Sequence, residues 1–349
     1  MEKVSDDISG EILIRLPAKS IGRLRCVCKR WNTLLCEPNF IKSHLHRCSI
    51  NNNKDEEVLL VFNRGFLPKA HPCASPDIEL TNFVNLTVNF PSEEAQIHST
   101  VIGSANGLIC FSVGFFDDSV IHIWNPSISA LLTVPPYAIP VPSDSPNVHY
   151  NFRFGFDPEN DDYKIVKLIR ADDEWLQVEV SIDGHDGHLH WLCFNDDLEI
   201  HTIVAFHLAA ESFTEISLPD PIAAADYDNL HTWFDLGVFS GMLCVISSTR
   251  GVGDCGCEVW VMDGSSWVET GFSHSHIGGI TPCGFTFKNN FLYQDCNQVL
   301  HLYDSAANKV KPFHKVTPNL SSITDIIIIP YAESLVWVTP PTPAPATTH

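Results

Sequence analysis

The sequence of 349 residues contains no long run of apolar side chains. Its longest apolar stretches, such as Ile326–Ile329 with the residues beside it, extend for about five residues, whereas a membrane-spanning helix needs roughly 20. The first residues include Glu2 and Lys3 and show no apolar signal segment. We therefore expect a protein that neither spans a membrane nor is secreted, and that works in the cytoplasm, the nucleus or both.

Several signatures of common enzymes are also missing. The sequence has no Gly-x-Ser-x-Gly nucleophile motif, no glycine-rich phosphate loop at the start of a helix and no His-Glu-x-x-His zinc motif. The acidic clusters Asp161-Asp162, 172–174 and Asp196-Asp197 fall in predicted turns, where carboxylates are usually solvated. We therefore expect no catalytic residue and no cofactor.

Histidine and cysteine are present, but their spacing is weak support for a metal site. His185, His188 and His190 are close in sequence, and the last two would point to the same side of a strand. Cys255-Gly-Cys257 lacks the second ligand pair of a structural zinc site, which favours a loop with two free thiols. The 12 cysteines have no regular spacing, so they are expected to be reduced and to bind no metal.

Basic residues are scarce after residue 50. Residues 1–50 hold nine Lys/Arg and five Asp/Glu, whereas the rest of the chain holds 12 Lys/Arg and 37 Asp/Glu, a net charge of −25. Because nucleic-acid-binding proteins usually present a clustered basic face, nucleic acid is a poor partner for this larger part. Its acidity serves solubility or, as the alternative, favours a basic protein partner.

Residues 1–48 show helical periodicity. Ser5, followed by two aspartates, predicts a helix N-terminus, and Pro17 ends this first helix. Ser20 is expected to cap a second helix and Pro38 to begin a third. The apolar positions at helical spacing are Ile8, Ile12, Leu13 and Leu16, then Leu24, Val27, Trp31, Leu34 and Leu35. A unit of this size has little core of its own and usually needs a partner surface to bury its apolar side chains.

Two segments carry a resemblance to a known family. Residues 7–20 (DISGEILIRLPAKS) and 23–35 (RLRCVCKRWNTLL) closely resemble the F-box, especially the plant form with its LPAKS and CVCK-W blocks. The resemblance implies docking of a Skp-type adaptor, which joins a cullin ubiquitin ligase. The docking residues that it implies are Val4, Ile8, Leu13, Leu16, Pro17, Leu24, Val27 and Trp31.

The sequence departs from this family at one place. Family members usually begin the first helix with Leu-Pro, and this chain has Val4-Ser5 there. Two alternatives therefore stay open: a diverged relative that no longer docks the adaptor, or apolar side chains that only form a small helical core.

After a predicted polar linker at 49–57, alternation with period two replaces the helical pattern. A unit of three predicted strands recurs, each time introduced by a turn pair. The turn pairs are Asn106-Gly107, Asp186-Gly187, Ser240-Gly241 and Asn289-Asn290, separated by 80, 54 and 49 residues. A further hairpin, 154–168, lies in the widest interval. A period near 50 is typical of kelch-like propeller blades, so we expect a mainly β chain with a small α-helical N-terminal module.

Sequence blocks in this part resemble a second family unit. The blocks GSANGLIC (103–110), IWNPS (123–127), FGFDP (154–158), DYKIV (162–166), GHLHW (187–191), VWVM (259–262) and YAESLV (331–336) are similar, in the same order, to the F-box-associated domain of plant F-box proteins. The last block looks most like the S-locus F-box group, which acts in pollen recognition of S-ribonucleases. The resemblance implies a substrate-binding domain over 58–338, with one blade shortened near 181–186.

Together these patterns predict the substrate-recognition subunit of a Skp-cullin-F-box ubiquitin ligase, a non-catalytic adaptor whose β-domain binds a protein such as a basic S-ribonuclease. A propeller enzyme is the less favoured alternative. Exposed aromatic side chains such as Trp175 or the pair Phe115-Phe116 would be interface anchors or part of the core. The proline-rich tail, 339–349, is expected to be disordered.

Overall fold

The structure is a computed structural model. It describes residues 6–52, 58–63, 69–72, 84–85, 99–114, 120–135, 148–171, 178–180, 187–194, 200–223, 232–249, 254–277, 280–297, 299–304, 306–312 and 326–337. Ser5, Trp175, Phe115-Phe116 and the predicted tail lie outside these residues.

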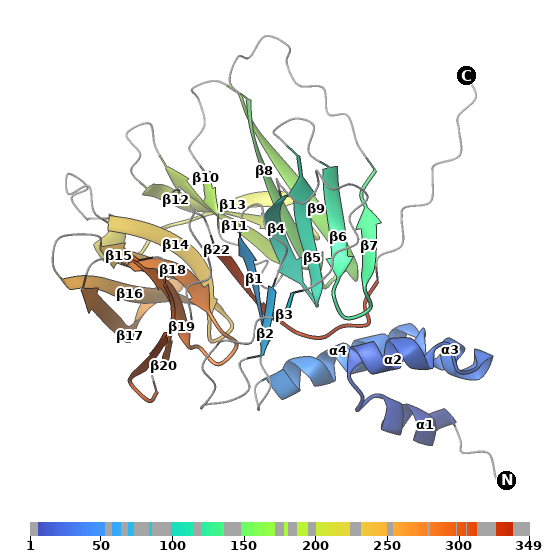
Figure 1. Ribbon diagram of the computed structural model, residues 1–349. Helices are drawn as coiled ribbons and strands as arrows, with labels where there is room; N and C mark the ends of the chain where they lie inside the picture. The colour runs from blue at the N-terminus through green and yellow to red at the C-terminus, as the bar shows by residue number, and fades with distance from the viewer. Residues whose placement is uncertain are drawn as a thin grey trace, which may run out of the picture.

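Four helices form the N-terminal module. They are α1 (Asp6–Leu13), α2 (Ala18–Leu24), α3 (Lys29–Leu35) and α4 (Pro38–Asn52). Figure 1 shows them together beside one edge of the β-region. None of the helices in the described part of the chain has the length and apolarity that crossing a membrane requires. The helix α4 continues to Asn52 and so extends into the predicted linker.

The second predicted helix is in fact two. The chain leaves the helix after Leu24, and Cys28 adopts an extended backbone with φ −159° and ψ 159°. The Cys28 sulfur then accepts a hydrogen bond from the Trp31 N–H at 3.4 Å and caps α3. The expected cap at Ser20 is also wrong, because α2 already begins at Ala18, directly after Pro17. Propensity and apolar spacing alone did not reveal this break.

The described strands form five sheets of four strands and one sheet of two, arranged as a propeller (Figure 1). The first sheet contains β22 (Ile326–Tyr331), β1 (Val58–Asn63), β2 (Lys69–Pro72) and β3 (Val84–Asn85). The second contains β4 (Ser99–Ala105), β5 (Leu108–Val113), β6 (Val120–Asn125) and β7 (Ala130–Thr133). The two-stranded sheet contains β8 (Val148–Asp157) and β9 (Asp162–Ala171).

Three more sheets complete the ring. One contains β10 (Val178–Val180), β11 (His188–Phe194), β12 (Ile200–His207) and β13 (Ser212–Ile216), followed by the short helix α5 (Asp220–Ala223). The next contains β14 (Thr232–Phe239), β15 (Met242–Thr249), β16 (Asp254–Asp263) and β17 (Ser266–Ile277). The last contains β18 (Ile280–Phe285), β19 (Phe291–Asp295), β20 (Leu300–Asp304) and β21 (Lys309–Pro312).

The C-terminal strand closes the ring. β22 pairs antiparallel with β1, so the last described strand is the first strand of the sheet that opens the propeller. Contacts run from β22 to β18, β18 to β14 and β14 to β10, and β8 touches both β4 and β11. Val101 of β4 shares an apolar cluster with Ile329 and Tyr331 of β22, which completes the circle. The propeller is therefore held shut by ordinary antiparallel pairing between the two ends of the domain.

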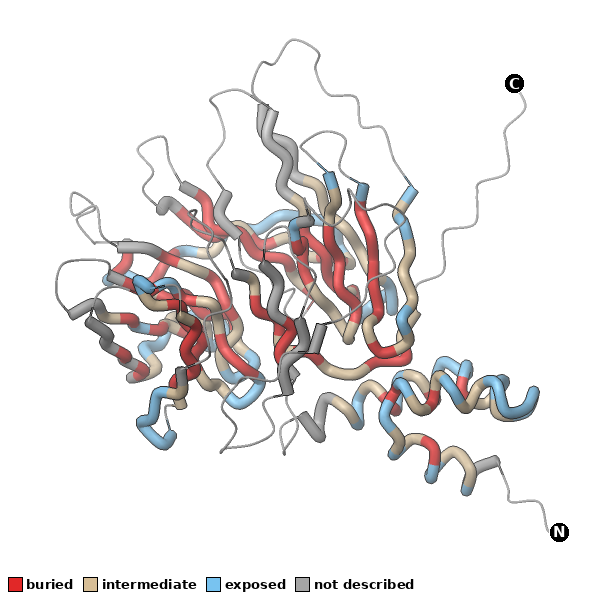
Figure 2. The backbone as a smooth tube through the Cα atoms, in the orientation of Figure 1, coloured by how far each residue is buried: buried red, intermediate tan, exposed pale blue. Residues whose placement is uncertain are grey.

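Each sheet buries its faces against its neighbours. Phe154 of β8 packs with Ile102 and Cys110 of the preceding sheet, whereas Trp191 of β11 belongs to a cluster that includes Val166 of β9. Figure 2 shows buried positions concentrated in the strands and exposed positions at many of the turns and along the outer faces of the helices. Each of these two clusters combines residues of neighbouring sheets, which favours stacking of the sheets in a ring.

The repeating strands were predicted at the right places but with one strand missing from each unit. An extra strand precedes each predicted one: β4, β10, β14 and β18. Two of the turn pairs, Asn106-Gly107 and Ser240-Gly241, form the tight two-residue hairpins that join β4 to β5 and β14 to β15. Asn106 and Gly107 have φ of 51° and 76°, and Ser240 and Gly241 have 52° and 75°, a backbone that asparagine and glycine adopt most readily.

The sheet with the fewest described strands directly precedes the deletion predicted near 181–186. Residues Val178–Val180, which precede the predicted deletion, pair with β11 in a complete four-stranded sheet. The sheet with only two described strands is instead β8–β9, the hairpin predicted at 154–168. Cys255 and Cys257 are also placed differently from the expectation, because they lie in strand β16 and not in a loop.

Candidate functional site

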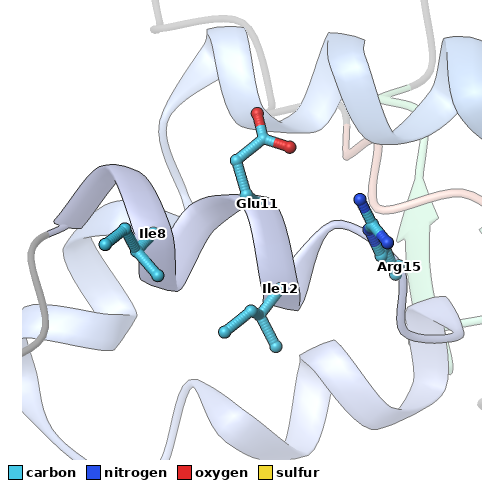
Figure 3. A pocket seen from close by; sticks show the side chains of 4 residues that line it. All are labelled: Ile8, Glu11, Ile12 and Arg15. Atoms are coloured by element: carbon cyan, nitrogen blue, oxygen red, sulfur yellow. The ribbon is translucent and has the colours of Figure 1, made fainter.

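The helix α1 presents two apolar side chains to solvent. Ile8 and Ile12, one turn apart, are 56% and 59% exposed, although isoleucine is among the residues most often buried. Together with Glu11 and Arg15 they line an open pocket of about 520 Å³ (Figure 3). The next residue, Leu13, points the other way and is buried. The helix therefore has an inner face that holds the module together and an outer apolar face.

The turn between α2 and α3 adds a third exposed apolar residue. Val27 is 61% exposed and lies in the break between the two helices. This turn is held in place because the Arg25 guanidinium donates a hydrogen bond to the Leu35 carbonyl at 2.9 Å. Pro17, at the start of α2, is exposed as well. We call Ile8, Ile12 and Val27 the exposed apolar set.

The remaining predicted docking residues that the structure describes pack inside the module, Pro17 excepted. Leu16, Leu24 and Trp31 are half-buried and pack against a core whose buried members are Leu13, Ala18, Ile21, Leu35, Phe40 and Leu335. Val4 lies outside the described residues. The prediction listed Ile12 as part of the helical stripe but not as a docking residue. Its spacing of four residues from Ile8 was the signal that could have included it.

One member of this core comes from the far end of the chain. Leu335 is fully buried among the helices although it follows the last strand of the propeller. Beside it, the Glu333 carboxylate accepts a hydrogen bond from the Ala18 N–H at 2.9 Å and so caps α2. We call residues 332–337, which run from β22 onto the helices, the C-terminal strap.

The strap is anchored on the β4–β7 sheet. Asn125 donates hydrogen bonds from its side-chain amide to the carbonyls of Ser334 and Val336, at 3.0 and 2.7 Å. The Ser127 hydroxyl accepts one from the Ser334 N–H at 3.1 Å and is hydrogen-bonded to the Tyr331 hydroxyl at 2.5 Å. Burial raises the pKa of Tyr331 far above its usual range. Helices and propeller are thus joined through a buried polar network.

A buried histidine supports the same junction. His44 of α4 is fully buried, and its Nε2 lies 3.0 Å from the Leu16 carbonyl oxygen. Burial lowers the pKa of His44 below its usual value of 6.5, although the contact with Leu16 acts in the opposite direction. The neutral ring, donating from Nε2, therefore ties α4 to the end of the first helical segment.

The structure also places the histidine and acidic clusters that were considered as possible metal or catalytic sites. The rings of His188 and His190 lie 6.1 Å apart, and His188 also contacts His207 at 4.5 Å, but His185 lies outside the described residues. Within the described part of the chain, no three His, Cys, Asp or Glu side chains are grouped as metal ligands would be. Asp161 sits in an exposed turn and pairs with Lys42 of α4 at 2.7 Å.

Two segments of the chain match known protein families. Residues 2–43 match the F-box domain, and residues 57–182 match the F-box associated beta propeller domain. The chain therefore carries an F-box followed by an F-box associated domain, and it is homologous to F-box proteins of Arabidopsis thaliana.

Two relatives show how far the likeness extends. The F-box protein CPR1 of Arabidopsis thaliana is 27% identical, over 75% of this chain and 70% of that protein. The F-box/kelch-repeat protein At3g23880 from the same plant is 24% identical, over 72% and 73% respectively. Among solved structures, TolB from Acinetobacter baumannii aligns with 79% of this chain and 59% of TolB at 7% identity with a TM-score of 0.34. A score this low does not establish a shared fold.

Proposed function

We propose that this chain is the substrate-recognition subunit of a Skp-cullin-F-box ubiquitin ligase in the cytoplasm or nucleus. The F-box helices bind a Skp-type adaptor, and the cullin through it, while the propeller holds a protein target. The chain itself performs no covalent chemistry. It acts by proximity, because a bound target has its lysines at high effective concentration near the ubiquitin thioester.

The observation that carries this proposal is the exposed apolar set. Ile8, Ile12 and Val27 are each more than half exposed, whereas apolar side chains of the same module such as Leu13, Ile21 and Leu35 are buried in its core. Exposed apolar surface beside a well-formed core is typical of an interaction site. The alternative of a merely structural helical core does not explain why these three side chains face away from that core.

Co-purification of the full chain with a Skp-type adaptor tests the proposal. The variants I12D and V27D should abolish co-purification, because a carboxylate in a buried apolar interface is not solvated. V310D is the matched control, since Val310 is 43% exposed on the outermost strand of the last sheet. Leu16 is less suitable for this test because it packs against the core and its substitution would also unfold the module. Failure of the wild-type chain to bind any adaptor would support the diverged-relative alternative.

A narrower function, in the S-locus group with a secreted S-ribonuclease as the target, is the second candidate. Its support is the charge of the chain after residue 50, which is −25 and favours a basic partner. We expect a basic S-ribonuclease to bind the full chain at low salt and to be released as ionic strength rises. Equal binding to an acidic ribonuclease would contradict this narrower proposal while leaving the ligase proposal intact.

A further inference from the structure

Arg153, in the middle of β8, places a positive charge inside the propeller. It is only 4% exposed, although arginine is almost never fully buried unless it is paired. Its Nη1 donates a hydrogen bond to the carbonyl of Phe152. Its other two nitrogens, Nε and Nη2, are buried and have no hydrogen-bond acceptor in the described part of the chain. A guanidinium stays charged at neutral pH, so the charge calls for a counter-ion that no described side chain provides.

The two unpaired nitrogens lie along one edge of the guanidinium. In arginine, the Nε–H bond and one N–H bond of Nη2 are parallel, and together they form a fork that matches the two oxygens of a carboxylate. Nη1, which binds the Phe152 carbonyl, is not part of this edge. The side of Arg153 that lacks a partner is therefore the side suited to a planar oxyanion.

Trp191 of β11 is a second buried donor beside this arginine. It is fully buried, and its indole Nε1–H has no acceptor in the residues that the structure describes. The guanidinium carbon of Arg153 lies over the Trp191 ring, 5.9 Å from the ring centroid. This cation–π contact offsets part of the charge but provides no oxygen for the unpaired N–H groups. Three N–H-bearing nitrogens of two touching side chains thus share the same need for an acceptor.

The acidic side chain on the same strand does not reach Arg153. Asp157 lies four residues further along β8, which is about 13 Å in an extended strand. Its buried carboxylate accepts hydrogen bonds from the backbone and side-chain amides of Asn160 and lies 3.4 Å from Lys164. Burial alone lowers the pKa of Arg153, to about 10, with no contribution from a carboxylate. The counter-ion of Arg153 must therefore come from outside these residues.

The other surroundings of Arg153 are apolar. It pairs with Val166 of β9 in the β8–β9 register, and Val166 belongs to the cluster that contains Leu189, Trp191 and Cys193 of β11. Because so little of Arg153 is exposed, a protein segment would have to separate the two sheets to reach it. A small molecule with one carboxylate and a short hydrocarbon part matches both the donors and the apolar walls.

We propose that Arg153 and Trp191 bind a small free carboxylate between the β8–β9 sheet and the β10–β13 sheet. Nε and Nη2 of Arg153 bind its two oxygens, and the Trp191 indole provides a third donor. The bound anion neutralises the buried charge and joins two adjacent sheets, so it stabilises the propeller. The site shares no residue with the exposed apolar set and goes beyond the proposed ligase function.

Titration of the full chain with sodium acetate at neutral pH tests the site. In proton–nitrogen NMR spectra, the indole signal that W191F removes and the Nε–H signal that R153K removes should both shift until they saturate. Acetamide, which has the same shape and no charge, should have no effect, and sodium chloride controls for ionic strength. A response to acetamide or chloride as strong as the response to acetate would overturn the carboxylate assignment. No saturable response to acetate would overturn the site itself.

Variants at Arg153 separate its charge from its geometry. R153K keeps the charge and loses the fork, so it should bind acetate about tenfold more weakly or worse. R153M removes the charge, so acetate should no longer raise its melting temperature. R23M, the matched change at an exposed arginine of α2, should respond to acetate as the wild type does. If R153M does not fold, R153K decides: a melting-temperature response equal to that of the wild type would contradict the proposal.

A larger carboxylate distinguishes a free acid from a side chain of a bound protein. The blocked peptide N-acetyl-Gly-Glu-Gly-amide presents the same group on a larger body and should shift neither NMR signal. Binding as tight as that of acetate would assign the carboxylate to a protein partner and overturn the free-acid proposal. Failure of the ligase proposal would be seen separately, because I12D should abolish adaptor binding and leave acetate binding intact, whereas R153M should do the reverse.

Discussion

The Ala18 N–H donates to the Glu333 carboxylate at 2.9 Å, across 315 residues of sequence. One partner is the first residue of α2, and the other follows the last strand of the propeller. Because the first N–H groups of a helix have no partner within it, this carboxylate also meets the positive end of the helix dipole. The contact means that the orientation of the F-box helices is fixed by the propeller end of the chain.

Removing this cap should destabilise the chain modestly. We expect E333A to lower the free energy of unfolding by about 1 kcal/mol, the usual cost of losing a helix cap. E333Q should cost less, because the amide oxygen still accepts the hydrogen bond. Urea unfolding of the full chain measures both. E269Q is the control, since Glu269 is exposed on β17; a loss in that variant equal to the loss in E333A would contradict a specific role for the cap.

The second contact of the strap, the burial of Leu335, should contribute more to stability than the Glu333 cap does. Leu335 is fully buried in the core of the helical module, and truncating a buried leucine to alanine costs about 2–5 kcal/mol. We expect L335A to unfold the helices at lower urea concentration than the propeller, so that the transition separates into two. V310A, at an exposed position, should change stability by no more than about 0.5 kcal/mol. A single unshifted transition for L335A would show that the strap does not hold the module.

Much of the fold could be predicted from the sequence because its signals are local. Turn pairs such as Asn106-Gly107 and Ser240-Gly241 require positive φ, and the strands after them have clear apolar patterns. Two of the four missed strands have a physical reason for the failure. Strand β4 (STVIGSA) and strand β18 (ITPCGF) contain small residues, proline or glycine, so their alternation is weak.

The junction could not be predicted because its contacts are remote in sequence. Nothing in the local pattern around Glu333 or Leu335 indicates that they cap and fill a module near residue 18. The docking set was predicted from a family pattern, which does not separate outward side chains from inward ones. Ile8 and Val27 are exposed, whereas Leu13 supports them from the inside.

Acid should loosen the helical module through His44. Because burial lowers the pKa of His44 in the folded state, the unfolded chain binds more protons once the pH falls to about 6.5, the ordinary histidine value. The stability that the neutral ring contributes is therefore present at pH 8 and is lost as the pH falls through 6.5 toward the folded-state pKa. We expect the difference in unfolding free energy between wild type and H44N to shrink between pH 8 and pH 5.

His122, whose pKa is also lowered by burial, provides the control for this pH effect. It lies on β6, where it contacts Thr133 and the ring of Phe111, so H122N should alter the pH dependence of the propeller and leave that of the helical module unchanged. Hydrogen exchange of the α4 amides reports on the helical module alone and so distinguishes its pH dependence from that of the propeller. A pH profile of α4 that is the same in wild type and H44N would rule out the role of His44.

The most specific test of the strap compares alanine substitutions at two glycines that have nearly the same backbone φ. Gly107 and Gly241 have φ of 76° and 75°, so alanine at either position carries the same strain, about 1–2 kcal/mol. They differ in surroundings. A Cβ on Gly107 would overlap Ser334 Cβ and lie 2.6 Å from the Ala332 carbonyl oxygen, whereas a Cβ on Gly241 meets nothing within 4 Å.

G107A should therefore cost about 1–3 kcal/mol more than G241A, because the overlap displaces the strap. Displacing Ser334 also moves Glu333 and Leu335, so the amides at the start of α2 should lose protection in G107A and keep it in G241A. Unfolding free energies and hydrogen exchange of the two variants give the comparison. Equal destabilisation with unchanged exchange in α2 would mean that the strap adjusts without disturbing the helices, and the rigid junction inferred from Ala18 and Glu333 would be wrong.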